Sequence, residues 1–144
     1  MARLDIKSLS SLQVSRHLIP RHDLIPNTSI QKKALLIYHS CIPASASASN
    51  IESHLYGFGG EGNPSRVEAL VIKGDVIVVP AGVGHRLLDD FNSGFEMIGS
   101  YPRGENWDMC YGKAGEEQKV EGIHNLGWFD KDPLYGDKGP VLED

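Results

Sequence analysis

The sequence predicts a mainly β protein that folds as one compact domain, an antiparallel barrel or sandwich. Three observations support this prediction. The 144 residues suit a single domain and can bury a sizeable core. The 16 glycines and 8 prolines are typical of a chain rich in turns. Short apolar runs separated by turn residues follow one another closely, as they do in antiparallel β folds.

The first half of the chain predicts an arm, a strand and a helix. Residues 1–33 are expected to form an N-terminal arm lying on the domain, because two Ile-Pro steps favour extended backbone. The run ALLIYHS, residues 34–40, is short and apolar, which indicates a buried strand. The letters SNIE that follow match a helix capping box, so a short helix is expected over 50–56. FGGEGNPS, residues 58–65, has the composition of a turn.

The second half predicts a sheet and a tail. Strands are expected over residues 66–72, 75–79, 85–89 and 95–101. With the earlier strand they define a barrel domain over 34–112. Residues 113–144 are rich in Gly, Asp and Lys and carry spaced aromatic residues, so they are expected to be an irregular tail packed on the barrel. Trp107 and Trp128 are interpreted as packing anchors for that tail.

Composition and charge narrow the class of protein. The formal net charge is -5, and the scattered Lys and Arg residues give no basic patch, so no nucleic-acid partner is expected. No apolar run approaches the roughly 20 residues of a membrane span, and the N-terminal residues lack the apolar core of a secretory signal. Cys41 and Cys110 have no CxxC spacing and are expected to be free thiols, Cys110 in a buried position. The expected location is therefore cytoplasmic, with no membrane partner.

The most informative stretch is GDVIVVPAGVGHRLLDD, residues 74–90. It contains the complete pattern G-x5-P-x-G-x2-H, formed by Gly74, Pro80, Gly82 and His85. The first glycine permits the turn between two strands, the proline ends the strand, and the second glycine allows a turn that a side chain would obstruct. Side-chain alternation then predicts His85, Leu87 and Asp89 on one face of the following strand.

This pattern resembles the second conserved motif of the cupin superfamily, the RmlC-like jelly-roll β-barrels, with Asp89 where that motif usually has Asn. The GGE turn before it and the segment GSYPRGENWDMCYG, residues 99–112, are similar to YjlB-like single-domain cupins. The resemblance implies a cupin-type jelly-roll barrel with His85 pointing into its interior. It also implies a homodimer, because cupins often form dimers.

The first cupin motif, which supplies two histidines and a glutamate in metal-binding members, is missing. The sequence contains no H-x-H. His54 and Glu61 have the spacing of the outer ligands, but Tyr56 takes the place of the middle histidine, so their spacing is interpreted as coincidence. The strands of the first motif are expected to be lost between Tyr56 and Gly57, which would leave the barrel incomplete.

The candidate site is therefore small. His85 is the one candidate metal ligand, and Asp89 and Glu96 are candidate polar residues of the barrel interior. Divalent metals need three or four protein ligands, or three and a water. No cofactor is therefore expected at full occupancy, whereas a completed site would take Fe, Mn, Ni or Zn. The ordinary pKa of histidine also suits general acid-base work, and that role stays open.

Three functions remain open at this point. The chain is expected to be a small-molecule-binding or vestigial cupin without a full metal site. Alternatively it is a metal-dependent enzyme of the oxygenase or isomerase class that uses His85. A third alternative is an interaction module that pairs an exposed sheet edge with a second copy. The choice between enzyme and binding protein stays open, because a fold alone does not determine a reaction.

Overall fold

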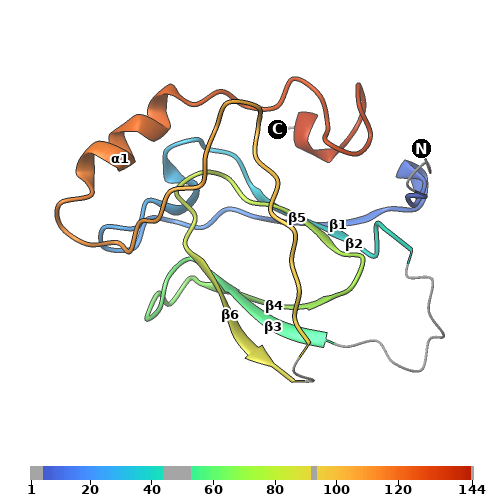
Figure 1. The fold of residues 1–144 in the computed structure, drawn as a ribbon, viewed down its shortest axis with the longest axis horizontal. Helices are drawn as coiled ribbons and strands as arrows, with labels where there is room; N and C mark the ends of the chain where they lie inside the picture. The colour runs from blue at the N-terminus through green and yellow to red at the C-terminus, as the bar shows by residue number, and fades with distance from the viewer. Residues whose placement is uncertain (1–4, 44–52, 92–93, 144) are drawn as a thin grey trace.

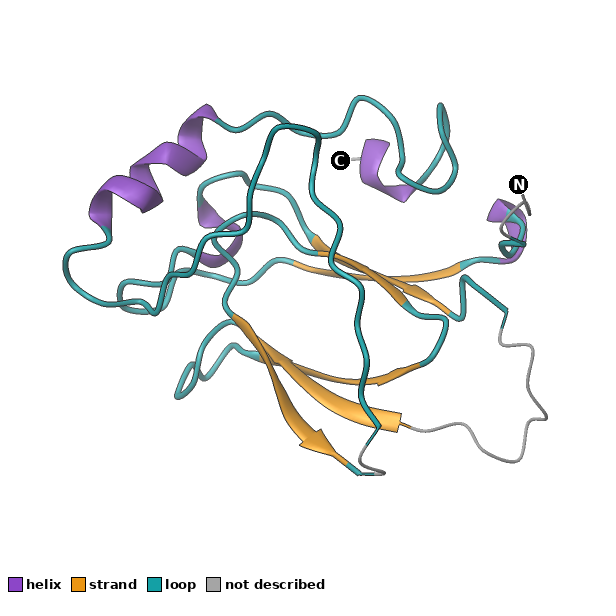
Figure 2. Cartoon of the chain, viewed as in Figure 1, coloured by secondary structure: helices purple, strands orange, loops and turns teal. Residues whose placement is uncertain are grey.

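The computed structural model describes residues 5–43, 53–91 and 94–143, and within them it shows two open three-stranded antiparallel sheets (Figures 1 and 2). Sheet I has the order β1-β2-β5, with β1 at Gln13–His17, β2 at Leu35–His39 and β5 at Val76–Val78. Sheet II has the order β4-β3-β6, with β3 at Ser53–Phe58, β4 at Val67–Ile72 and β6 at His85–Asp90. The mainly β prediction is confirmed, as a two-sheet sandwich.

The helices of the described residues are short. They are α1 (Glu117–Gly122) and the 3-10 turns η1 (Leu9–Ser11), η2 (Asn27–Ser29), η4 (Ile123–Asn125) and η5 (Pro140–Leu142). In the part of the chain that the structure describes, no helix has the length and apolar character needed to cross a membrane. The one α-helix of the described residues, α1, lies in the tail, which was expected to be irregular.

The helix expected over 50–56 is wrong for the residues that the structure describes. Residues 53–56 belong to β3, and residues 50–52 lie outside the described part. His54, Tyr56 and Phe58 are buried at every second position, which is the period of a strand with one face on a core. Burial of three rings on one face outweighs a local capping signal, because tertiary packing overrides propensity.

β3 includes the point between Tyr56 and Gly57 at which the sequence predicts loss of the first-motif strands. The strand runs through both residues, which pair with Ala69 and Glu68 of β4. The loss of first-motif strands at that point stays a prediction. The described chain passes from sheet I to sheet II between the end of β2 and the start of β3.

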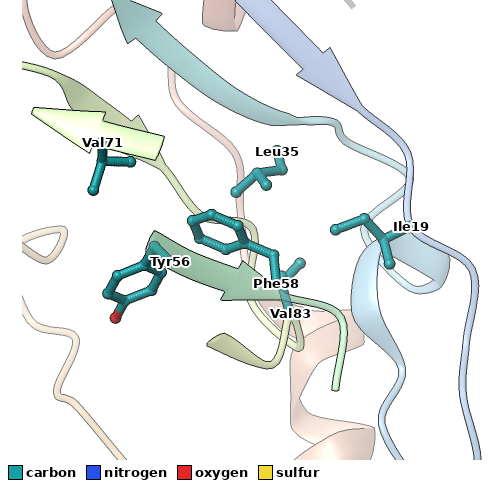
Figure 3. Close-up of a cluster of buried hydrophobic side chains, with 6 residues drawn as sticks. All are labelled: Ile19, Leu35, Tyr56, Phe58, Val71 and Val83. Atoms are coloured by element: carbon teal, nitrogen blue, oxygen red, sulfur yellow. The ribbon is translucent and has the colours of Figure 1, made fainter. Parts of the chain in front are cut away.

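A hydrophobic core fills the space between the two sheets. Its buried members are Ile19, Leu35, Tyr56, Phe58, Val71 and Val83. Figure 3 shows Phe58 near the centre of this cluster and the Tyr56 hydroxyl pointing out of it. We call the side of sheet II that faces this core its inner face, and the opposite side its outer face.

A second core lies on the other side of sheet I, beneath the C-terminal tail (Figure 1). Its buried members are Ala34, Leu36, Tyr38, Cys41, Val78 and Val141. Trp128 and Phe129 of the tail pack against it, as expected for packing anchors. Because Leu35 faces one core and Leu36 the other, β2 is buried on both sides, which explains its continuous apolar run.

Two predicted segments differ from the structure. The N-terminal arm contributes β1, which pairs with β2 along its whole length. The strand expected over 95–101 is absent, since none of these residues pairs with a strand. Figure 1 shows that segment as a single trace leaving the end of β6 and running past both sheets toward the tail.

Candidate functional site

The G-x5-P-x-G-x2-H segment forms the turns that its residues predict. Gly74 has a φ of +97°, and a Cβ there would overlap the carbonyl oxygen of Ile42. Pro80 is fully buried after β5. Gly82 has a φ of +95°, and a Cβ there would press on the N-terminal arm. These constraints place His85 at the first position of β6.

Asn27 holds this turn in place, and the sequence analysis missed it. Its side chain is fully buried and donates from Nδ2 to the carbonyl oxygens of Pro20 (2.9 Å) and Gly59 (3.0 Å). Its Oδ1 accepts the backbone N–H of Gly84 at 3.2 Å, and its own N–H donates to Gly82. One side chain thus joins the arm, the turn after β3 and the loop leading to His85. The Pro-Asn step in the arm was the available signal, since both residues favour turns.

His85 lies on the inner face of sheet II among aromatic rings. Its Nδ1 is 3.0 Å from the Oη of Tyr56, and the two rings stack with centroids 5.9 Å apart. The Phe58 ring lies 6.4 Å away. The residue as a whole is exposed, but burial of the ring part facing these aromatics lowers the pKa of His85 below its ordinary 6.5. Burial likewise raises the pKa of Tyr56 above 10.0, so both groups are neutral near pH 7.

The second ring nitrogen of His85, Nε2, bonds no residue that the structure describes. The contact with Tyr56 instead fixes the orientation of the ring through Nδ1. A neutral imidazole has one donor and one acceptor nitrogen, so the free nitrogen can offer one hydrogen bond to a ligand.

A β-bulge in β6 changes which acidic residue faces the interior. The register moves from Tyr56 opposite Leu87 to Leu55 opposite Asp89, which leaves Leu88 as the extra residue. Asp89 therefore shares the outer face with Leu55 and is exposed. The predicted alternation fails at this residue because the bulge shifts the two-residue period by one.

The bulge places Asp90 on the inner face instead. Its Oδ1 lies 2.8 Å from Nδ1 of the buried His54, an ion-pair distance without hydrogen-bond geometry. Its Oδ2 accepts the backbone N–H of Phe95 at 3.1 Å, and Oδ1 accepts that of Gly94 at 3.3 Å. Desolvation opposes ionisation of Asp90, but these two N–H groups and His54 together bring its pKa below 3.8. Sequence alternation gave no signal for this pair.

The segment after β6 contributes two apolar contacts to the site. The Phe95 ring lies 5.8 Å from that of Tyr56 and meets His54 edge-on at 5.1 Å. The Sδ of Met97 is 3.9 Å from the Oη of Tyr56. Glu96, between them, is exposed, so it does not supply the interior carboxylate that the sequence suggested.

The described residues do not fit a divalent metal. No group of three His, Cys, Asp or Glu side chains within them is arranged to hold an ion. The polar neighbour of His85 is a tyrosine, whereas His54 and Asp90 pair at the other end of β3 and β6. Glu61, which the spacing had linked to His54, lies in the turn after β3 and contacts Arg86 at 3.4 Å.

Two surface hollows lie elsewhere on the molecule. One, of about 170 Å³, is lined by Ile30, Gln31, Lys33, Ile123, His124, Leu126 and Trp128. The other, of about 360 Å³, is lined by Arg16, Leu18, Lys32 and Ala34. Neither contains His85. Neither hollow contains a histidine that a hydrogen bond holds in place on a strand, as Tyr56 holds His85. We therefore place the candidate site at His85.

The cysteines are not candidates for catalysis. Cys41 is buried, with its Sγ 3.3 Å from the Oη of Tyr135. Cys110 is exposed, which corrects the expectation that it is buried. Desolvation and the negative charges of Glu116 and Asp108 raise the pKa of the Cys110 thiol, which disfavours the reactive thiolate.

Comparison with known proteins gives a relative whose name assigns it no activity. The chain is 40% identical over 88 residues to "Uncharacterized protein YjlB" of Bacillus subtilis (strain 168), a match that covers 60% of this chain. The chain spans about half the length of that relative, since the match covers 50% of it. No family model matches the chain. No solved structure matches it either.

Proposed function

We propose that this chain is a cupin-type β-sandwich that binds a small organic molecule at the inner face of sheet II without a resident metal. The observation that carries the proposal is the state of His85. Its Nδ1 is held by Tyr56, while Nε2 bonds no described residue. A ring nitrogen oriented by one partner and open at the other is ready to bind a ligand group.

Two further observations support the cupin part of the proposal. Gly74 and Gly82 have positive φ and Pro80 is buried, in keeping with the turns of the resembled motif. The described strands form two antiparallel sheets packed face to face, an arrangement consistent with an incomplete jelly roll. The 40% identity to YjlB indicates that the two proteins are related, but it does not indicate an activity.

The surroundings of His85 indicate the chemical class of the ligand. The half-buried Phe95 adds apolar surface beside Tyr56, and the buried rings of Tyr56 and Phe58 lie beneath His85. Both polar groups are neutral near pH 7, because burial lowers the pKa of His85 and raises that of Tyr56. The site therefore suits a small planar molecule with one hydrogen-bonding group, such as a phenol or an aromatic carboxylic acid.

A ligand titration followed by NMR tests this proposal. Phenol and benzoate at millimolar concentrations are expected to shift the ring resonances of Phe95, which packs on Tyr56 beside His85, and cyclohexanol serves as the non-aromatic probe. The shifts should disappear in His85→Phe and weaken in Tyr56→Phe, while Asp89→Asn on the outer face should leave them unchanged. Absence of any shift, or an equal shift in His85→Phe, would indicate a vestigial site.

The alternative function is a metal-dependent enzyme of the oxygenase or isomerase class that uses His85. One observation favours it: metal-binding histidines usually have their second ring nitrogen held by a hydrogen bond, as Tyr56 holds Nδ1 here. Such an enzyme needs further ligands that the described residues do not supply. Elemental analysis that finds about one Fe, Mn, Ni or Zn per chain, lost in His85→Ala, would favour this alternative.

A further inference from the structure

The hydroxyl of Tyr56 faces two acceptors but has one proton to donate. Its Oη lies 3.0 Å from Nδ1 of His85 and 3.9 Å from Sδ of Met97. A thioether sulfur is a weak acceptor, whereas an unprotonated imidazole nitrogen is a good one. The shorter contact with the stronger acceptor therefore directs the Tyr56 proton to His85, and Met97 competes for it only weakly.

Met97 is open to solvent even though its sulfur touches a buried residue. It is 59% exposed, whereas Tyr56 is 8% exposed. In the part of the chain that the structure describes, the segment carrying Met97 pairs with no strand, so no neighbouring strand covers its side chain. Phe95 fixes the start of this segment, because its N–H donates to Asp90 and its ring packs on Tyr56. A small oxidant can thus reach a sulfur atom that is held beside the His85 site.

Oxidation of this sulfur would reverse the competition for the Tyr56 proton. Hydrogen peroxide transfers one oxygen atom to the thioether, which loses two electrons and becomes a sulfoxide, while the peroxide is reduced to water. The Sδ–Oη separation of 3.9 Å exceeds an ordinary O–H···O distance of about 2.7 Å by roughly the length of a covalent bond. The added oxygen can therefore come within hydrogen-bond distance of Oη. Because a sulfoxide is polar and its oxygen accepts hydrogen bonds, the Tyr56 proton then bonds to Met97 instead of His85.

Loss of the Tyr56 proton changes the tautomer of His85. While Tyr56 donates to Nδ1, the proton of the neutral ring resides on Nε2. Once the hydroxyl donates to the sulfoxide, its oxygen can only accept a hydrogen bond from His85. The ring proton then resides on Nδ1, so Nε2 changes from a hydrogen-bond donor to an acceptor.

We propose that Met97 is an oxidation site that sets the tautomer of His85 through the hydroxyl of Tyr56. The oxidation and the change of tautomer follow from the contacts of these three side chains alone. Their effect on binding rests on the proposed function. Benzoate, which only accepts hydrogen bonds, should bind about ten-fold more weakly to the oxidised chain, whereas phenol, which can also donate, should keep its affinity.

NMR of the ring nitrogens of His85 tests the change of tautomer without a ligand. All chains carry Cys110→Ser, so that no exposed thiol consumes peroxide, and the remaining Cys41 is buried. Met109, which is 45% exposed, supplies the matched control. Peroxide should move the His85 proton from Nε2 to Nδ1 in Met109→Leu, which keeps Met97, and should leave it on Nε2 in Met97→Leu. Peptide mass spectrometry shows which methionine has gained an oxygen atom.

Two further variants test the route through Tyr56. Met97→Gln places an amide oxygen near the hydroxyl and should give the oxidised tautomer without peroxide. Tyr56→Phe removes the hydroxyl, so oxidation of Met97 should no longer move the His85 proton. A methionine sulfoxide reductase should restore the original tautomer in the otherwise native chain. The proposal is wrong if Met97 resists peroxide, if its sulfoxide leaves the tautomer unchanged, or if oxidised Met97→Leu shows the same change.

The ligand titration with phenol and benzoate, repeated on the oxidised chain, separates this proposal from the proposed function. If the tautomer changes but neither probe binds, the ligand site is wrong and the oxidation site stands. If both probes bind and oxidation alters neither the tautomer nor the preference between them, the oxidation site is wrong and the ligand site stands.

Discussion

The two ring nitrogens of His85 have different environments. Nδ1 meets the Tyr56 hydroxyl, and Nε2 meets no described residue. With Tyr56 as the donor, the proton of the neutral imidazole resides on Nε2, which becomes a hydrogen-bond donor toward a ligand. The lowered pKa of His85 keeps the neutral form dominant at pH 7, so the proposed ligand would meet an uncharged ring.

The first prediction concerns the titration of His85. An NMR pH titration should place its midpoint below 6.5, the ordinary value, because ring burial disfavours the charged form. Folding then favours the deprotonated ring, so its stabilising contribution is complete above pH 6.5 and is lost as the pH falls through the folded pKa. His85→Phe should flatten the fall of the melting temperature in acid, and a substitution of the exposed His124 should leave it unchanged. A midpoint above 6.5 would contradict this account.

Asn27 gives the second prediction. Asn27→Ala removes three side-chain hydrogen bonds and leaves two carbonyl groups, of which that of Gly59 is buried, and one N–H without that partner. The expected loss in the free energy of unfolding is about 2–4 kcal/mol, measured by urea denaturation.

The backbone of Asn27 supplies a matched control. Its φ is +50°, a conformation that Asn and Gly adopt more readily than Ala. Asn27→Gly loses the same hydrogen bonds, but glycine adopts the positive φ without strain. Its loss in the free energy of unfolding should therefore be about 1 kcal/mol smaller than that of Asn27→Ala. Equal losses in both variants would show that the backbone conformation contributes nothing.

At the scale of elements, the strands bounded by clear turn residues were the predictable ones, even where their partners lie far away in the sequence. β4, β5 and the start of β6 lie within two residues of their expected positions, because Gly74 and Gly82 mark the turns between them. β3 was mistaken for a helix because the capping-box letters are local, whereas burial of His54, Tyr56 and Phe58 depends on the rest of the fold.

The segment 95–101 shows a second reason why sequence-based prediction of strands fails. Its composition and alternation predict a strand, yet the structure gives it no pairing. A strand is stabilised by hydrogen bonds to a neighbour, so a strand-like sequence needs a partner as well as a pattern. The sequence analysis also predicted loss of the strands of the first cupin motif, and that loss would account for an unpaired segment.

The bulge in β6 gives the third prediction, which compares two adjacent aspartates. Asp90 accepts two backbone N–H groups and lies beside His54, while Asp89 has no hydrogen bond or ion pair with a described residue. Asp90→Ala should therefore lower the melting temperature, and Asp89→Ala should leave it nearly unchanged. Without the bulge, Asp89 would face the interior and Asp90 the solvent, so Asp89→Ala would lower the melting temperature more. A larger effect of Asp89→Ala would therefore refute the bulge.

At the scale of the whole molecule, the tail acts as a third layer. Sheet II, sheet I and the C-terminal segment stack so that β2 contacts both cores (Figure 1). Arg16 of β1 reaches the tail as well, with Nη2 2.8 Å from Oε2 of Glu143 and 3.1 Å from the carbonyl of Pro140. Removal of the tail would expose an apolar face of sheet I, so the tail is part of the folding unit.

Asp132 is the polar centre of that layer and gives the fourth prediction. It is buried, and its Oδ2 accepts the hydroxyl of Tyr38 at 2.6 Å. Its Oδ1 accepts the backbone N–H groups of Leu134 and Tyr135 at 2.9 and 3.0 Å. Asp132→Ala removes these bonds and leaves the Tyr38 hydroxyl buried without its acceptor, so we expect a loss of about 3–5 kcal/mol in the free energy of unfolding.

The exposed Asp130 supplies the matched control, since Asp130→Ala should change stability by no more than about 0.5 kcal/mol. A double-mutant cycle with Tyr38→Phe measures the contact between β2 and the tail directly, and a coupling of about 0.5–3 kcal/mol is expected. Limited proteolysis should cut the Asp132→Ala tail faster than the native one, because the clamp that orders residues 132–141 is gone. Zero coupling together with unchanged proteolysis would mean that the other contacts, the packing of Trp128 and Val141 and the bonds of Arg16, hold the third layer in place without Asp132.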